Sequence, residues 1–140
     1  MAELMRADVT SEGISIAALT ALVTDERCGA VVTFTGDVRN HDGGKEVTTL
    51  TYEIHPSAGD KIAEITQAVI KRADVVKVAV SHRYGEIPIG ETAFAVAVSA
   101  AHRESAFQIC SALVDEIKAQ LPIWKHQVFS DGTDEWVNTA

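Results

Sequence analysis

Apolar residues recur along the chain at two spacings, one typical of helices and one typical of strands. The helical spacing, with apolar positions three or four residues apart, predicts helices over residues 15–29, 57–74 and 103–120. Ser15 suits the N-cap of the first helix, and Gly29 suits its end. The pattern therefore predicts three helices, each of which buries one face.

Runs rich in β-branched and aromatic residues fill the spaces between these helices. They predict strands over residues 29–40, 47–55, 75–85, 92–100 and 123–129. We expect the first two strands to form a hairpin around the flexible turn at residues 41–46. Paired strands mixed with helices indicate an α+β sandwich and not a doubly wound parallel sheet.

Length and composition limit the class of protein. The chain has 140 residues, 46% of them hydrophobic, which is enough for one compact domain over residues 1–140. No apolar stretch approaches the ~20 residues of a membrane span, and the first residues lack the basic and apolar segments of a secretion signal. Cys28 and Cys110 form no CxxC pair and indicate no disulfide framework. We therefore expect a cytoplasmic protein that does not bind membranes.

The distribution of charge is more informative than its sum. The formal net charge of −8 argues against a general nucleic-acid-binding protein, which would carry a basic stripe. Yet Lys118, Lys125 and His126 lie close together late in the chain, not far from His102 and Arg103. A basic pair at the start of a helix, where the dipole already attracts anions, is suited to hold something negative.

Several other kinds of site are disfavoured. The five histidines are scattered and show no metal-ligand spacing, so neither a metal nor another cofactor is expected. Cys28 lies near a helix end and Cys110 on an apolar helix stripe, neither of which favours a reactive thiolate. The Gly-Gly-Lys sequence at residues 43–45 lacks the spacing of a phosphate-binding loop, and no GxSxG motif is present.

The lysine pair remains as candidate chemistry. Lys118 falls in the last turn of the third helix, where a cation also simply complements the helix dipole. Pro122 then turns the chain, and Lys125 follows on the returning strand, so the two amines are expected to share one cleft. Crowding and burial lower a lysine pKa toward the range in which the amine transfers protons or attacks carbonyls. Arg39, at the end of an earlier strand, is a further candidate for the cleft.

Five segments, in this order, resemble one known family. They are "GAVVTFTGDVRNH", "LTYEIHP", "HRYGEIPIGE", "SAAHRESAF" and "KAQLPIWKHQ". Together they are similar to the large, catalytic subunit of molybdopterin synthase. The resemblance implies an α+β protein of the α/β hammerhead type with an additional antiparallel β subdomain. It also implies a homodimer that binds two small ubiquitin-like sulfur carriers as a heterotetramer.

The activity that the resemblance implies is sulfur transfer. The C-terminal Gly-Gly thiocarboxylate of the carrier enters a pocket of the large subunit, and its sulfur passes to cyclic pyranopterin monophosphate to build the molybdopterin dithiolene. Lys118 and Lys125 match the catalytic lysines of the family. Arg39, His102 and Arg103 match positions that hold the phosphate and pterin of the substrate, a task for which the arginine fork is suited.

The chain also departs from the family pattern, and other functions remain open. His126 and Gln127 follow the Trp-Lys pair where the family often has an acid, and His55 precedes a proline where an aromatic residue is more usual. One alternative is a non-catalytic binding module for an acidic peptide tail or a phosphorylated ligand. Another is a metal-dependent hydrolase, which elemental analysis of the purified protein would reveal. Substitution of Lys118 by arginine separates the first alternative from an enzyme, because a binding module tolerates it.

Overall fold

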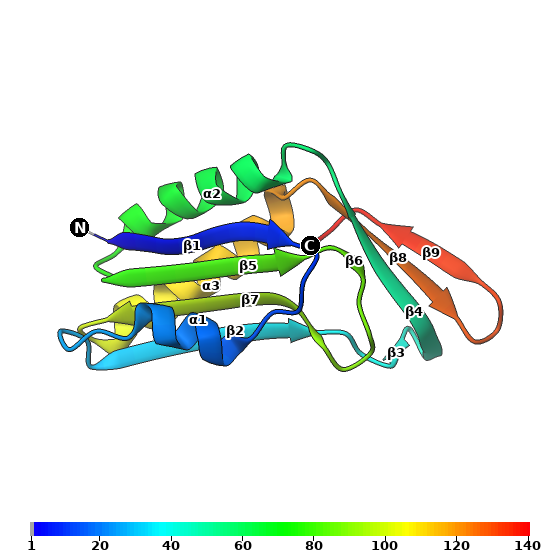
Figure 1. Ribbon diagram of the computed structural model, residues 1–140, viewed down its shortest axis with the longest axis horizontal. Coiled ribbons are helices and arrows are strands. Elements are labelled where there is room, and N and C mark those ends of the chain that lie inside the picture. Colours follow the sequence, from blue (N-terminus) through cyan, green and yellow to red (C-terminus); the bar gives the residue numbers. More distant parts are fainter. Residues whose placement is uncertain (1) are drawn as a thin grey trace.

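The computed structural model describes residues 2–140 and contains two β-sheets with three helices (Figure 1). The first sheet has the order β1-β5-β7-β2, in which β1 and β5 are parallel and the other pairs are antiparallel. Its strands are β1 (Glu3–Thr10), β2 (Ala30–Asp37), β5 (Lys77–Arg83) and β7 (Thr92–Ala100).

The second sheet is antiparallel and extends from the end of the first (Figure 1). Its path runs β3-β4-β8-β9, and β6 pairs with β4. The strands are β3 (His41–Asp42), β4 (Lys45–Ile54), β6 (Gly85–Glu86), β8 (Ile123–Phe129) and β9 (Asp134–Val137). This mixture of sheets and helices confirms the predicted α+β class.

The helices cover both faces of the first sheet. They are α1 (Ile16–Val23), α2 (Ala58–Val69), which continues as a 3-10 turn (Ile70–Arg72), and α3 (Arg103–Gln120). Side chains alternate along a strand, so Val96 and Val98 of β7 join the core beneath α2 and α3. Ala95 and Ala97 point the other way, and their small side chains admit α1. No helix within residues 2–140 is long and apolar enough to cross a membrane.

The expected hairpin between residues 29–40 and 47–55 is wrong. β2 pairs with β7, and β4 pairs with β8, so the two segments belong to different sheets. The backbone of Val38 forms hydrogen bonds with the Glu91 carbonyl and the Gly90 N–H. These bonds direct the chain out of the first sheet after β2. The hairpin that does form joins β3 and β4 within the predicted turn, around two glycines with positive φ.

The first helix is also shorter than predicted. It starts as expected, with the Ser15 hydroxyl accepting from the Ala18 N–H, but it ends at Val23 and not near Gly29. The Asp25 carboxylate accepts hydrogen bonds from the Arg27 backbone and side chain, which stabilises a turn in place of further helix. Strands β1 and β9 were not anticipated, since the predicted order contained no strand before residue 15 or after residue 129.

Candidate functional site

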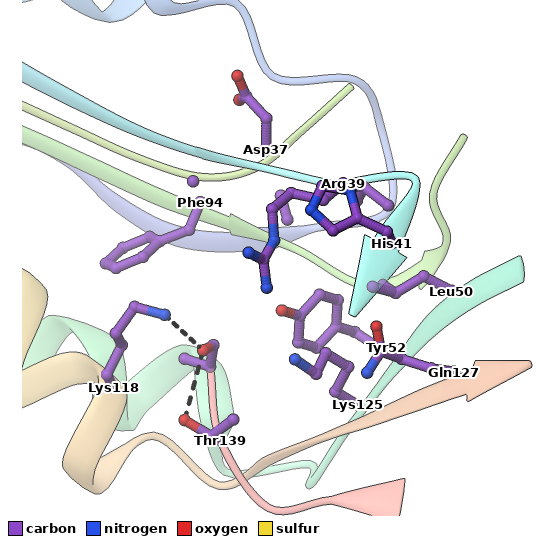
Figure 2. A pocket seen from close by; sticks show the side chains of 14 residues that line it. Asp37, Arg39, His41, Leu50, Tyr52, Phe94, Lys118, Lys125, Gln127 and Thr139 are labelled. Carbon is purple, nitrogen blue, oxygen red and sulfur yellow. Dashed lines mark hydrogen bonds between the residues drawn. The ribbon is translucent and has the colours of Figure 1, made fainter. Parts of the chain in front are cut away.

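A cavity of about 210 Å³ lies where the end of the first sheet, the last turn of α3 and the second sheet meet. Figure 2 shows the guanidinium of Arg39 and the amines of Lys118 and Lys125 pointing into it. Tyr52 and Gln127 also line the cavity, together with Thr139 and Ala140. The structure therefore brings three of the five predicted site residues to one place.

Lys118 owes its position to the end of α3. The Leu121 backbone N–H closes the helix by bonding to the Ile117 carbonyl at 2.9 Å, and Pro122 then directs the chain into β8. The Lys118 amine donates a hydrogen bond to the Ala140 carbonyl oxygen at 3.0 Å. Burial of the amine and, second, the Lys125 charge lower the pKa of Lys118 below its usual range. This amine is placed to bind a carbonyl oxygen and to exchange a proton.

Lys125 enters the cavity because residues of β8 alternate between two faces. Lys125 and Gln127 face the cavity, and Lys125 lies directly opposite Tyr52 of β4. Tyr52 is only 8% exposed, and burial raises its pKa to about 12, so its hydroxyl keeps its proton and is a hydrogen-bond donor. His126 points the other way, stacks on Trp136 and forms an ion pair with Asp134 when it is protonated.

Arg39 reaches the cavity from the connection between β2 and β3. Its guanidinium Nη2 lies 3.5 Å from the Asp42 Oδ1, and about two thirds of its side chain is exposed. An exposed guanidinium at the mouth of a cavity remains available to a ligand. Its planar fork suits an oxyanion such as a phosphate group.

His102 and Arg103 are not brought to this cavity within one chain. They lie at the start of α3, where both are exposed and His102 is the N-cap without a side-chain capping bond. At the helical rise of about 1.5 Å per residue, Arg103 lies roughly 22 Å along the axis from Lys118. A single chain therefore does not bring all five candidate residues to one cavity.

Sequence reasoning missed the groups that surround the cavity. Tyr52, Asp42 and Gln127 were not singled out as site residues, although strand alternation puts Gln127 on the same face as Lys125. His82 was also missed: it is fully buried, stacks on Phe94 and meets the Tyr52 ring edge-on. Burial lowers the pKa of His82 to about 4. Its neutral ring packs against Tyr52 and Phe94, which both line the cavity.

The side chains of the described residues bear on whether the protein could hold a metal ion. Within the described part of the chain, no cluster of three or more histidine, cysteine, aspartate or glutamate side chains is arranged to hold a metal ion. The cavity presents ammonium and guanidinium groups, which repel cations. The site therefore fits an anion or a carbonyl compound better than a metal ion.

Comparison with known proteins agrees with this picture. The model of a family described as MoaE protein matches residues 9–120. A molybdopterin synthase catalytic subunit from Rattus norvegicus is 36% identical over 128 residues, which are 91% of this chain and 64% of that relative. One from Thermoplasma volcanium is 35% identical over 130 residues, which are 92% of this chain and 95% of that relative.

Solved structures give the same result. The crystal structure of molybdopterin synthase from Staphylococcus aureus has a TM-score of 0.85 and 31% identity, covering 94% of this chain and 96% of that one. The resemblance found in the sequence is confirmed by both kinds of comparison. The chain belongs to the MoaE family, to which the molybdopterin synthase catalytic subunits belong.

Proposed function

We propose that this chain is the catalytic subunit of a molybdopterin synthase, a sulfurtransferase of molybdenum cofactor biosynthesis. One observation carries the proposal: the amines of Lys118 and Lys125 and the Arg39 guanidinium share a cavity in which Lys118 already donates a hydrogen bond to the main-chain oxygen of Ala140. The substrate that fits is cyclic pyranopterin monophosphate. The sulfur source that fits is the thiocarboxylated C-terminal Gly-Gly of a small ubiquitin-like carrier, acting in the cytoplasm.

The geometry suggests how the work is divided. The Lys118 amine donates a hydrogen bond to the acyl oxygen of the thiocarboxylate, as it does to the Ala140 main-chain oxygen at 3.0 Å. This contact polarises the acyl group. The sulfur bonds to a carbon of the precursor and displaces an oxygen leaving group; water then adds to the acyl carbon, the acyl carbon–sulfur bond breaks, and the carrier leaves as its carboxylate. Because burial and Lys125 lower the pKa of Lys118, its amine exchanges protons more readily than an exposed lysine does. Arg39 and Lys125 hold the anionic precursor beside it.

His102 and Arg103 enter the proposal through a second copy of the chain. Roughly 22 Å along α3 separates Arg103 from Lys118 in one subunit, so a role at the same substrate requires another subunit. We therefore propose a homodimer in which each cavity is completed by the partner's basic pair, with one carrier bound per copy. The hammerhead-type description and the single domain over residues 1–140 belong to the same proposal.

A complex of the two subunits exists for a protein of this fold. The complex of subunits 1 and 2 of molybdopterin-converting factor from Helicobacter pylori contains a chain with a TM-score of 0.70 and 19% identity to this one. At that identity the likeness concerns the fold alone. The complex supports the proposal that this chain, too, binds a second subunit.

The second candidate is a non-catalytic module that captures a peptide tail. It is favoured by the hydrogen bond from Lys118 to Ala140, because a site that binds one main-chain oxygen can bind another. The variant Lys118→Arg, which keeps the positive charge, distinguishes the binding module from the enzyme. A binding module keeps its affinity in Lys118→Arg, whereas a carbonyl-activating or proton-exchanging amine loses its function.

The test is a reconstitution with precursor and thiocarboxylated carrier, with dithiolene pterin as the product measured. Wild-type protein should give product, and Lys118→Ala and Lys118→Arg should lower turnover at least 100-fold while carrier still binds. Lys61→Ala is the control, since Lys61 lies on α2, pairs with Glu64 and does not line the cavity. Turnover by Lys118→Arg at the wild-type rate would refute the assignment, and absence of product from wild-type protein would refute the function.

A further inference from the structure

Asp42 lies behind the cavity and connects two of its walls. Its Oδ2 accepts a hydrogen bond of 2.7 Å from the Gln127 side-chain amide, and its Oδ1 faces the Arg39 Nη2 at 3.5 Å. Asp42 comes from β3, Gln127 from β8, and Arg39 from the segment before β3. Arg39 and Gln127 line the cavity and Asp42 does not, so Asp42 can orient a ligand only through its neighbours.

The residue that anchors this carboxylate is buried, whereas its guanidinium partner is largely exposed. Gln127 is only 3% exposed, and its amide also lies 3.4 Å from the Glu135 carboxylate, which fixes its orientation. The Arg39 side chain is 66% exposed and that of Asp42 is 31% exposed. An ion pair with that exposure adds little stability. It does place a carboxylate on one side of an exposed guanidinium.

The charges around Asp42 favour its ionised form. The Gln127 hydrogen bond first, and then the charges of Lys125 and Arg39, lower the pKa of the Asp42 carboxyl group. The carboxylate is therefore present at neutral pH as the counter-charge to two cations of the cavity. Gln127, on the same strand as Lys125, contributes only a neutral amide. The negative charge comes from Asp42 on β3.

We propose that Asp42, anchored by Gln127, is a positioning residue that aims the Arg39 guanidinium at the anionic substrate. The inference rests on the proposed function for its kinetic test. The negative charge is needed at this spot, and either of the two hydrogen-bonded residues can supply it. Moving the carboxylate from residue 42 to residue 127 across the same hydrogen bond should preserve its effect.

The chain contains a matched control for this arrangement. Glu116 accepts a 2.7 Å hydrogen bond from the Gln120 amide and pairs with Arg72 at 3.4 Å, and its side chain is 34% exposed. Distances and exposure thus resemble those of the Asp42 arrangement, but none of these three residues lines the cavity. Glu116→Gln removes the same kind of charge without touching the site.

The kinetic test compares Asp42→Asn, Gln127→Glu, the double variant and Glu116→Gln in the reconstituted reaction. We expect Asp42→Asn to lower kcat about ten-fold, because a misplaced guanidinium weakens transition-state contacts. KM should change less than three-fold, since removing a negative charge also strengthens attraction for an anion. Gln127→Glu should raise KM, because a second carboxylate opposes anion binding. The double variant should return to within three-fold of wild type, and Glu116→Gln should match wild type.

A double-mutant cycle shows whether Asp42 acts through Arg39. In an Arg39→Lys background, adding Asp42→Asn should change kcat less than two-fold, because the fork to be aimed is already absent. An equal ten-fold loss in that background would overturn the proposal. Wild-type kcat in Asp42→Asn, or a double variant no better than Asp42→Asn, would also overturn it.

A structural readout keeps the inference separable from the proposed function. The NMR order parameter of the Arg39 Nε–H should fall in Asp42→Asn and recover in the Asp42→Asn/Gln127→Glu variant, without any substrate present. An order parameter unchanged by Asp42→Asn would overturn the positioning role. Absence of turnover in wild-type protein would instead refute the proposed function, and the order parameter would still decide the role of Asp42.

Discussion

Lys118 and Lys125 belong to different elements, and their amines face one cavity across the bend at Pro122. The Lys125 charge is the second cause, after burial, of the lowered pKa of Lys118. The two lysines therefore act as a pair in which one tunes the other. This relationship gives the first prediction.

Lys125→Met should raise the pKa of Lys118. Removing a nearby positive charge makes protonation of the remaining amine easier, so the midpoint moves toward higher pH. The pKa should stay below that of an exposed lysine, because burial of the Lys118 amine is unchanged. Titration of lysines labelled with 13C at Cε, followed by NMR, measures the midpoint. A midpoint that stays in place or moves to lower pH would show that the amines do not interact.

Mixed dimers should recover activity that two variants lack separately. In the proposed homodimer, Lys118→Ala and Arg103→Ala each damage a different half of a site shared between subunits, because the two residues lie at opposite ends of α3. In a heterodimer, one of the two cavities keeps both residues, and random pairing makes about half of the dimers heterodimers, so turnover of the mixture should rise to about a quarter of the wild-type value. The measurement is product formation after the two variants are unfolded together and refolded. If the mixture is no more active than its components, the shared site is contradicted.

The stability of the protein should fall between pH 6.5 and pH 4 because of His82. Burial lowers the pKa of His82 from 6.5 to about 4, so in this range the unfolded chain binds a proton that the folded chain does not. Stability is fully present above pH 6.5 and is lost as pH decreases toward 4. The loss attributable to this one group is about 3 kcal/mol.

His82→Phe tests this pH dependence. Phenylalanine keeps the stacking on Phe94 but cannot be protonated. Urea unfolding at pH 7 and pH 4 should show that wild-type protein loses about 3 kcal/mol more than the variant does. Equal losses in both proteins would mean that His82 is not the titrating group. The substitution also removes the hydrogen bond from the His82 Nδ1–H to the Arg83 carbonyl, which lowers stability equally at both pH values.

Gly29→Ala should destabilise the fold by about 1–3 kcal/mol. A Cβ atom at Gly29 would lie 2.8 Å from the Ala101 carbonyl oxygen, a backbone atom that cannot move aside without disturbing β7 and α3. The control is Gly13→Ala, where nothing lies within 4 Å of the added Cβ. Chemical denaturation of both variants gives the comparison. Equal stability of the two variants would contradict the close approach.

Local patterns predicted the elements of this fold better than their partners. The predicted bounds 92–100, 103–120 and 123–129 coincide with β7, α3 and β8, because each carries a strong periodic signal between clear breaks. The hairpin between β2 and β4 was wrong because sheet pairing depends on contacts far apart in sequence. β1 was missed for the same reason, since it is held by parallel pairing with β5, which lies more than 70 residues later in the chain.

The site residues, like the elements of the fold, were predictable where their contacts are close in sequence. Lys118 and Lys125 were expected to meet because a short turn joins their elements, and the structure brings them to one cavity. Asp42 gave no such signal, since its contact with Gln127 spans 85 residues and depends on the pairing of β3, β4 and β8. Tyr52 was missed because it becomes a candidate site residue only by lying opposite Lys125 on the neighbouring strand. Such groups become visible only after the register of the sheet is known.

The hydrogen bond from Lys118 to Ala140 has a consequence for any measured affinity. Ala140 is 3% exposed in the cavity, so an incoming peptide end must first displace part of the subunit's own polypeptide. The apparent dissociation constant then equals the intrinsic one divided by the fraction of time that the space is vacant. The segment that ends at Ala140 therefore competes with an incoming peptide end, and this competition raises the apparent dissociation constant without changing the form of the binding curve.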